Sequence, residues 1–285
     1  MAPLVWLVTG CSSGFGNQFV HSILARGDKV VATARDLSRI RQLERLGVPI
    51  FQLDVTDSQS VINATIAKVL AEYGRIDVLV NNAAYIAIGT WEDLSYEDWL
   101  AQFDTNVFGT IKVTKAILPH FRERKTGTMV FISSLSGWVG HPGCSAYAGS
   151  KFALEGIVEG LHAETAHLGL KTLLVEPGRF RTNLLSSSNM KARLSDIAEY
   201  AESSRAQMTG LAGEDQKQPG DPAKLVEIVL DLVRGEGVAQ GMEVPFRLPL
   251  GVDCYTDIKE KCEATLAMLE TWKNVARSTD MENQN

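Results

Sequence analysis

Three side chains that can do chemistry together stand close in the sequence: the hydroxyl of Ser134, the phenol of Tyr147 and the ammonium of Lys151. Tyr147 and Lys151 are four residues apart, and apolar residues recur at three- and four-residue spacing over 152–168, which predicts a helix. Positions i and i+4 lie on one helix face, so the phenol and the ammonium can share one pocket. Because such a pair is by itself more often a solvated helix surface, its meaning depends on the elements around it.

Strand and helix alternate along the chain with short connections. Short apolar runs predict strands at 4–9, 30–34, 50–53, 77–80, 129–133, 172–176 and 242–246. Capping residues and helical periodicity predict helices at 14–26, 37–46, 58–73, 95–120, 152–168 and 255–277, and another beginning at Asp221-Pro222. Apolar strands between amphipathic helices specify a parallel sheet covered on both faces. We therefore expect an α/β, doubly wound, Rossmann-type fold with residues 1–285 as a single domain.

Composition excludes several classes of protein. The chain has 285 residues, a net charge of -6 and 45% hydrophobic residues, which is typical of a soluble globular protein with a large core. No basic run favours nucleic acid or a membrane surface, and no apolar run reaches bilayer-spanning length. Leu4 to Val8 is interpreted as a strand and not as a signal peptide. Four scattered cysteines show no metal-ligand spacing, so we expect no metal, reduced thiols and a cytoplasmic protein.

The first strand-to-helix turn is rich in glycine. Gly10, Gly14 and Gly16 follow the strand at 4–9 with the spacing Gly-x-x-x-Gly-x-Gly. Glycines let a backbone turn sharply and approach a pyrophosphate, which then lies on a helix N-terminus where free N–H groups favour an anion. The alternative is a tight structural turn, but the position after the first strand of an α/β fold favours nucleotide binding.

The ordered set of motifs resembles the short-chain dehydrogenase/reductase family. It comprises Thr-Gly-x-x-x-Gly-x-Gly at 9–16, Asn81-Asn82-Ala83-Ala84, Asn106, Ser134, Tyr147-x-x-x-Lys151, and Pro177-Gly178 with Thr182. The resemblance covers about residues 4–245, and residues 31–36 with the long C-terminal helix also resemble the 17β-hydroxysteroid dehydrogenase-like subgroup. Ala84 departs from the family pattern, where many relatives have glycine, but this change removes no chemical group.

The resemblance implies a role for each catalytic residue. Ser134 would hydrogen-bond the substrate oxygen, Tyr147 would donate the proton, and Lys151 would hold the nicotinamide ribose. Asn106 would anchor a water in a proton relay, although a structural polar residue inside a helix is the alternative. A cation about 4 Å from a phenol contributes about 4 kcal/mol at an effective dielectric constant near 20. We therefore expect Lys151, helped by an oxidised nicotinamide, to lower the pKa of Tyr147.

The second strand bears on the choice of cofactor. NAD sites place a carboxylate about eighteen residues past the last glycine, to accept from the ribose 2′-hydroxyl. That position is Ala34, and Arg35 follows it, which leaves room and charge for the 2′-phosphate of NADP. Asp36 could oppose a phosphate, but it is expected to cap the next helix. The cofactor-binding residues implied by the resemblance are Gly10, Ser12, Ser13, Gly14, Phe15, Gly16, Arg35, Asp54, Val55, Asn82, Ala83, Ala84, Tyr147, Lys151, Pro177, Gly178, Phe180 and Thr182.

The remaining segments bear on the substrate and on partners. Residues 183–220 correspond to the family's substrate lid, and 247–285 form a C-terminal helical extension in which Leu266, Leu269 and Trp272 are expected to face the core or a partner subunit. Candidate substrate contacts are Trp138, His141, Leu184, Leu185 and Met190. These side chains favour a bulky apolar carbonyl compound or secondary alcohol and a ketoreductase activity. For His141, an exposed loop histidine is the alternative. The family resemblance also implies a homo-oligomer, either a dimer or a tetramer.

Two other functions are compatible with this sequence. A fold and its cofactor site can be kept while the chemistry changes, so cyclisation or epimerisation of a reactive intermediate is one alternative. A non-catalytic protein that senses NADP is the other, although Ser134, Tyr147 and Lys151 are all present. Substrate identity, reaction direction and stereochemistry stay open.

Overall fold

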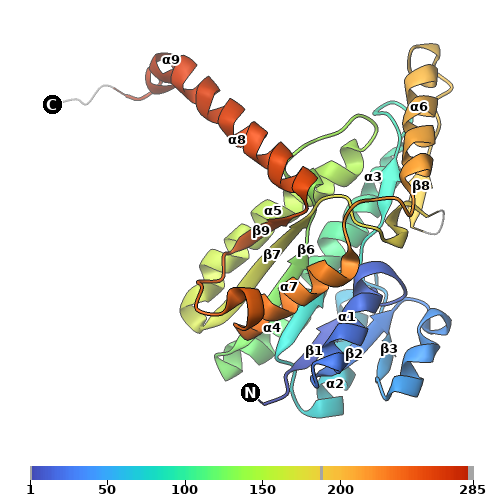
Figure 1. The fold of residues 1–285 in the computed structure, drawn as a ribbon, viewed down its shortest axis with the longest axis vertical. Helices are drawn as coiled ribbons and strands as arrows, with labels where there is room; N and C mark the ends of the chain where they lie inside the picture. Colours follow the sequence, from blue (N-terminus) through green and yellow to red (C-terminus); the bar gives the residue numbers. More distant parts are fainter. Residues whose placement is uncertain (1, 187–188, 282–285) are drawn as a thin grey trace.

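Seven parallel strands form the central sheet (Figure 1). The structure, a computed structural model, describes residues 2–186 and 189–281, so residues 187–188 of the expected lid and 282–285 of the expected extension lie outside the described residues. The strand order is β3-β2-β1-β4-β6-β7-β9, which reverses direction between β1 and β4 and confirms the single-domain, doubly wound fold. The strands are β1 (Val5–Val8), β2 (Lys29–Ala34), β3 (Ile50–Gln52), β4 (Val78–Asn81), β6 (Gly127–Ile132), β7 (Leu170–Pro177) and β9 (Arg247–Leu250).

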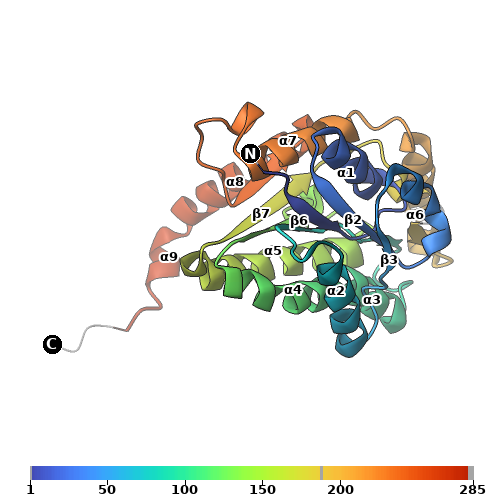
Figure 2. The same ribbon diagram turned by 90° about the horizontal axis from the view of Figure 1, so that it is seen from below.

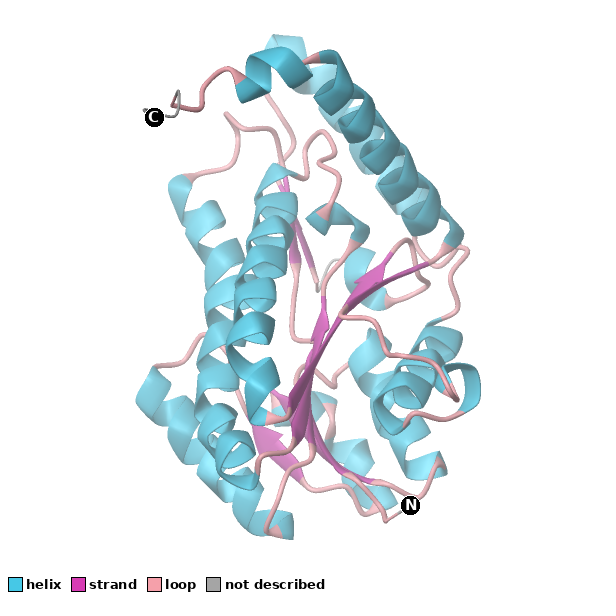
Figure 3. Ribbon diagram, turned by 90° about the vertical axis from the view of Figure 1, so that its left-hand side faces the viewer, coloured by secondary structure: helices cyan, strands magenta, loops and turns pink. Residues whose placement is uncertain are grey.

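Helices cover both faces of the sheet (Figures 2 and 3). On one face lie α1 (Gly14–Ala25) and α7 (Pro222–Arg234), and on the other α2 (Gln59–Tyr73), α4 (Thr110–Arg124) and α5 (Ser145–Thr165). The remaining helices are α3 (Tyr96–Phe103), α6 (Ala198–Glu214), α8 (Val252–Thr271) and α9 (Lys273–Arg277). Short turns of helix are η1 (Leu37–Arg39), η2 (Arg41–Leu46), η3 (Asp104–Gly109), η4 (Leu135–Gly137), η5 (Ala166–Leu168), η6 (Asn183–Leu185) and η7 (Gly237–Ala239).

Each central strand contributes side chains to two cores. In β1, Trp6 and Val8 belong to the cluster that includes the inner faces of α1 and α7, whereas Leu7 and Val5 belong to the cluster under α2, α4 and α5. All four residues are buried because successive side chains of a strand point to opposite faces. This explains why the strands read as continuous apolar runs.

Capping residues set several helix boundaries. Ser58 accepts from the backbone N–H of Val61, Ser95 forms a capping box with Asp98, and Asp221 accepts from the N–H of Ala223. The helix expected at 37–46 is two 3-10 turns instead, because the backbone at the buried Ile40 leaves helical geometry.

The C-terminal third departs most from the expectation. The strand expected at 242–246 is wrong: residues 242–246 form a loop, because hydrogen bonding to β7 starts only at the carbonyl of Phe246, and β9 begins at Arg247, which pairs with Leu174. The helix of 255–277 is α8 and α9, which project from the body of the protein (Figure 1). Its side chains Leu266, Leu269 and Trp272 are 64%, 49% and 57% exposed, so they do not pack in this chain's core. No helix in the described ranges is long and apolar enough to cross a membrane.

A second, two-stranded sheet was not expected from the sequence. β5 (Ile86–Ile88) pairs in parallel with β8 (Met190–Ala192), which joins the loop after β4 to the segment before α6. The Arg193 guanidinium pairs with the Asp98 carboxylate next to this sheet. The segment 183–220 is thus attached, through β8, to the strand that follows the carboxyl end of β4.

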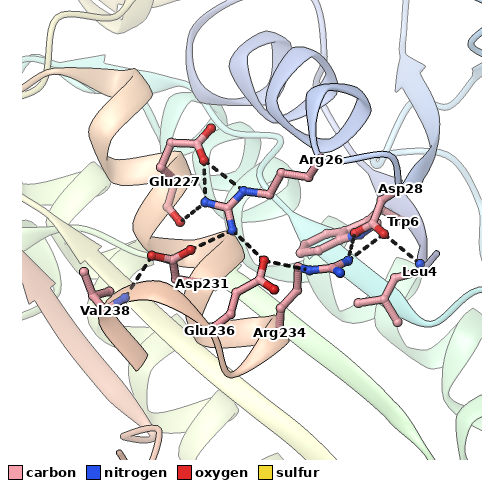
Figure 4. Close-up of polar contacts among 9 residues, drawn as sticks. All are labelled: Leu4, Trp6, Arg26, Asp28, Glu227, Asp231, Arg234, Glu236 and Val238. Carbon is pink, nitrogen blue, oxygen red and sulfur yellow. Dashed lines mark hydrogen bonds and ion pairs between the residues drawn. The ribbon is translucent and has the colours of Figure 1, made fainter. Parts of the chain in front are cut away.

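Two arginines join α1 and α7 (Figure 4). Arg26, at the end of α1, contacts the carboxylates of Glu227, Asp231 and Glu236. Arg234 Nη1 lies 2.6 and 2.7 Å from the two carboxylate oxygens of Asp28. Asp28 also accepts from the indole of Trp6 at 3.0 Å and from the N–H of Leu4 at 2.9 Å, so its buried carboxylate is fully paired.

We expect Asp28→Ala to lower the free energy of unfolding by about 3 kcal/mol, because it leaves the Trp6 N–H without an acceptor and the Arg234 guanidinium, 10% exposed, with only its contact to Glu236. Urea unfolding followed by circular dichroism measures this change.

Arg75→Ala is the control for that measurement. Its guanidinium is 44% exposed, and its partner Asp77 keeps a second contact to Arg124 at 2.7 Å. The control should cost less than about 1 kcal/mol. Equal losses in both variants would contradict the assignment of the Asp28 cluster as a buried, cooperative network.

Candidate functional site

A cavity of about 540 Å³ opens at the carboxyl edge of the sheet. Its wall is built from the segments that follow β1, β2, β3, β4, β6 and β7, so it spans the point where strand order reverses, the usual place for a ligand in this architecture. Most of the residues predicted from the sequence line it: Gly10, Ser12, Ser13, Gly14, Phe15, Arg35, Asp54, Val55, Asn82, Ala83, Ala84, Ser134, His141, Tyr147, Lys151, Pro177, Gly178, Phe180, Thr182, Leu184 and Leu185.

The glycine-rich turn is held against the loop after β4. The amide nitrogen of Asn82 donates to the carbonyls of Thr9 and Gly10 at 2.8 and 3.1 Å. Gly16 is buried under this contact and does not line the cavity: a Cβ there would lie 2.3 Å from the carbonyl oxygen of Gly10. Gly16 therefore acts through packing, because only glycine lets the helix begin so close to the turn.

The N-terminus of α1 faces this cavity and can receive an anion. Ser13, at the N-cap, is extended, and its side chain makes no capping hydrogen bond within the described part of the chain. The first turn of α1 carries no acidic residue. Open N–H groups and the helix dipole favour a phosphate at such a position. Phe15 and Phe180 pack edge to face, with ring centroids 5.5 Å apart, and close one wall.

The reactive side chains come from two elements. Tyr147 and Lys151 lie on consecutive turns of α5, and Ser134 is the N-cap of η4, directly after β6. The phenol of Tyr147 and the hydroxyl of Ser134 both line the cavity, and the interaction with Ser134 acts to lower the pKa of the phenol. The ammonium of Lys151 donates to the carbonyl of Ile132 at 2.8 Å and lies 5.7 Å from the centre of the Tyr147 ring.

The protein's own side chains do not lower the pKa of Tyr147, contrary to the effect expected from Lys151. Burial raises the pKa of Tyr147 to about 12, against a smaller lowering by Ser134. Burial also lowers the pKa of Lys151 to about 8. The reason is geometric, because Lys151 points toward β6 and both side chains have lost their hydration. The protein therefore holds Tyr147 as a neutral phenol, the form that can donate a proton.

Asn106 lies behind the cavity and does not line it. It belongs to the π-helical turn η3, and its amide nitrogen donates to the carbonyl of Tyr85 and to the hydroxyl of Ser150, both at 3.1 Å. Its amide oxygen accepts from the N–H of Tyr85 at 3.2 Å. The Asn106 side chain thus holds the residue before β5 against α5, and it does not reach the cavity.

Two guanidinium groups line the end of the cavity beyond β2. Arg35 was expected there, and Arg39, in η1, was missed although it lies four residues further on. Asp36 accepts from the N–H of Ser38 at 2.9 Å and caps η1, as expected. Hydrogen bonding by Ser38, through its side chain and then its backbone N–H, lowers the pKa of Asp36.

Two predicted substrate contacts do not line the cavity. Trp138 was expected near the mouth, but its indole N–H donates to Glu176 at 2.9 Å, under η4. Met190 packs against the apolar cluster of Ile86, Ile88 and Tyr147 without reaching the cavity wall. Pairing of β8 with β5 explains the position of Met190, since it fixes which face of the strand each side chain occupies.

The wall near Tyr147 is apolar. Leu184 and Leu185 were expected there, and Ile86, Cys144 and Leu211 join them from β5, the loop before α5, and α6. These three were missed because no local signal marks them, and only the tertiary fold brings them beside the phenol.

Comparisons with known proteins extend over the whole chain. A family model described as short chain dehydrogenase matches residues 4–193. The crystal structure of a short-chain dehydrogenase from Streptomyces avermitilis is 38% identical, with a TM-score of 0.87 over 98% of this chain and 99% of its own. Oxidoreductase BOA17 of Botryotinia fuckeliana is 34% identical, covering 95% of this chain and 97% of its own length. The 3-ketodihydrosphingosine reductase of Bacteroides thetaiotaomicron is 33% identical, covering 88% of this chain and 89% of its own length.

We expect Lys151→Met to stabilise the protein more at pH 7 than at pH 10. Burial lowers the pKa of Lys151 from 10.5 to about 8, so between these values the unfolded chain holds a proton that the folded chain has released. The stability of the wild type therefore rises with pH in this window relative to the variant. The free-energy difference between the two proteins should change by about 2 kcal/mol, measured by urea unfolding at both pH values.

Lys68→Met, on the exposed side of α2, controls for the loss of a lysine at the surface. A difference between the wild type and Lys151→Met that is the same at both pH values would contradict a buried ammonium at Lys151.

Proposed function

Because the chain belongs to the short-chain dehydrogenase family, we propose that this oxidoreductase is NADP-dependent. It transfers a hydride between nicotinamide and the carbonyl or secondary alcohol of a bulky apolar compound, working as a ketoreductase. The observation that carries the proposal is the buried phenol of Tyr147, which lines the cavity together with the hydroxyl of Ser134. A protonated phenol and a hydroxyl on one wall are the groups that a carbonyl oxygen needs as it gains charge and then a proton.

The residues present fit a dinucleotide. The N-terminus of α1 offers N–H groups to a pyrophosphate, and the close packing at Gly10 and Gly16 leaves that end of the helix open to the cavity. Lys151 lies on the cavity wall within reach of a nicotinamide ribose, and Asp54 and Val55 line the adenine end. The bound cofactor supplies or accepts the hydride, and the protein binds, orients and supplies the proton.

Two arginines that follow β2 support NADP over NAD. Ala34 offers no carboxylate for a ribose 2′-hydroxyl, and Asp36 is occupied as the cap of η1. Arg35 and Arg39 line the same end of the cavity and can both meet a 2′-phosphate.

The apolar wall beside Tyr147 supports a bulky, largely hydrophobic substrate. The similar protein from Bacteroides thetaiotaomicron is named for the reduction of 3-ketodihydrosphingosine, a ketone, which is the reaction class proposed here. Residues 183–220 act as the lid over this wall, through Leu184, Leu185 and Leu211. We infer further that the protein works as a homo-oligomer, and that its four free thiols suit the reducing cytoplasm.

The first expected outcome concerns the cofactor. Arg35→Ala should remove most of the preference for NADPH over NADH, because it deletes a charge-assisted contact to the 2′-phosphate. The loss for NADPH should be about thirtyfold in affinity, or about 2 kcal/mol, with little change for NADH. Titration of nucleotide fluorescence measures both affinities, and Arg41→Ala, outside the cavity wall, is the matched control. Equal losses for both nucleotides would sink the assignment of Arg35.

The second expected outcome concerns the proton. Tyr147→Phe keeps the ring in its apolar cluster and removes only the phenol oxygen. Turnover of the best ketone in a panel should fall at least about a hundredfold, while NADPH affinity changes less than about threefold. Consumption of NADPH followed by absorbance measures the rate. Near-full carbonyl reduction by this variant would overturn the proposed mechanism.

A further inference from the structure

Two buried carboxyl groups face each other behind the cavity. Glu155 lies one helical turn after Lys151 on α5, and Glu176 lies near the end of β7. They are 6% and 1% exposed, and the guanidinium of Arg247 lies 3.9 Å from each of them. A hydrogen bond between the two carboxyl groups would need a proton on one of them. Glu155 Oε2 receives no hydrogen bond from a donor in the described residues, which suits the oxygen that carries the proton.

The nearest cation does not neutralise both groups. Arg247, on β9, lies 3.9 Å from Glu155 Oε2 and 3.9 Å from Glu176 Oε1. Its short contact, 2.7 Å, is to Glu159, whose side chain is 67% exposed. One guanidinium is thus shared among three carboxyl groups, and two full negative charges in the buried pair would be undercompensated.

Other charged and titratable groups face the pair from α5 and α8. Lys151 attracts negative charge on Glu155, but its ammonium is hydrogen-bonded to the backbone of β6. The thiol of Cys254, on α8, donates to the backbone carbonyl of Glu176 at 3.1 Å. Asp253, on the same turn of α8, accepts from the backbone N–H of Arg179 at 2.7 Å, so its carboxylate is bound to another loop. The ammonium of Lys261, further along α8, donates to the backbone carbonyl of Trp138.

The pair carries both ends of the turn that presents Ser134. At the near end, the hydroxyl of Ser133 donates to Glu155 Oε1. At the far end, the indole of Trp138 donates to Glu176 Oε1 at 2.9 Å. In between, Gly137 packs so tightly that a Cβ would lie 2.9 Å from Glu155 Oε1. The position of the Ser134 hydroxyl therefore depends on these two carboxyl groups.

We propose that Glu155 and Glu176 share one proton and act as a positioning pair, which holds the turn from Ser133 to Trp138 and so keeps Ser134 against Tyr147. At alkaline pH the shared proton leaves to solvent and two negative charges face each other. Their repulsion then displaces the turn from Ser133 to Trp138. The catalytic consequence rests on the proposed function, whereas the shared proton does not.

Burial and the neighbouring carboxyl act in the direction that this proposal needs. Both raise the pKa of Glu155, and burial raises the pKa of Glu176. The donors Ser133 and Trp138 and the charge of Arg247 oppose this rise without cancelling it. The shared proton is therefore retained at neutral pH.

Infrared spectroscopy of the protein without substrate tests the shared proton directly. At pH 7 the wild type should show the stretching band of a protonated carboxyl group, shifted in heavy water, and the band should disappear on titration to alkaline pH. Glu155→Gln and Glu176→Gln should each remove or shift the band, because each replaces one of the two carboxyl groups that share the proton. Glu159→Gln, one turn further along α5 and bound to the same arginine, should keep it.

Two results would overturn the shared proton. One is the absence of the band from the wild type at pH 7, a measurement that does not depend on whether any variant folds. The other is a band that persists unchanged in both Glu155→Gln and Glu176→Gln. Neither depends on finding a substrate, so failure here is distinguishable from failure of the proposed reductase activity.

Kinetics with NADPH and phenanthrenequinone as the probe test the positioning role. Glu155→Ala should lower kcat by at least about tenfold, with the affinity for NADPH changed by less than about threefold, because the turn and not the cofactor cradle is disturbed. Glu155→Gln keeps a donor toward Glu176 and should recover most of the lost kcat. Equal losses of kcat in the alanine and glutamine variants would exclude the positioning role.

Discussion

A hydrogen-bonded clasp between the loops after β1 and β4 holds the site together. The hydroxyl of Thr9 accepts from the N–H groups of Asn82 and Ala83 at 2.9 and 3.0 Å, and the Asn82 amide donates back to the turn. These two strands are neighbours at the point where strand order reverses, and the cavity opens at this edge of the sheet. The clasp fixes the glycine-rich turn, and Gly10 and Gly16 are the residues that let the two loops come so close.

Burial governs the chemistry that this cavity can do. Loss of hydration keeps Tyr147 protonated and weakens the hold of Lys151 on its own proton. The same effect acts on Glu155 and Glu176 behind the wall, where acids retain a proton that water would remove. Proton donor, cation and supporting carboxyl groups thus share one physical cause, although they come from α5, β6 and β7.

Local patterns in the chain identified most of the fold and much of the site. Strands between two covered faces are apolar throughout, and the caps Ser58, Ser95 and Asp221 mark helix starts by direct hydrogen bonds. The wrong predictions concern residues whose structure depends on pairing with a segment far away in the sequence. Residues 242–246 are as apolar as a strand, yet pairing with β7 begins only at Arg247.

The types and spacing of residues in the chain were enough to specify the parallel sheet, the glycine-rich turn and the grouping of Tyr147 with Lys151, because each rests on local periodicity or backbone freedom. Contacts between segments far apart in sequence set the rest. They turned the Lys151 ammonium toward β6, placed Trp138 on a buried carboxyl instead of in the cavity, and paired Glu155 with Glu176. No sequence pattern records these outcomes, since burial and orientation exist only once the helices and strands have packed.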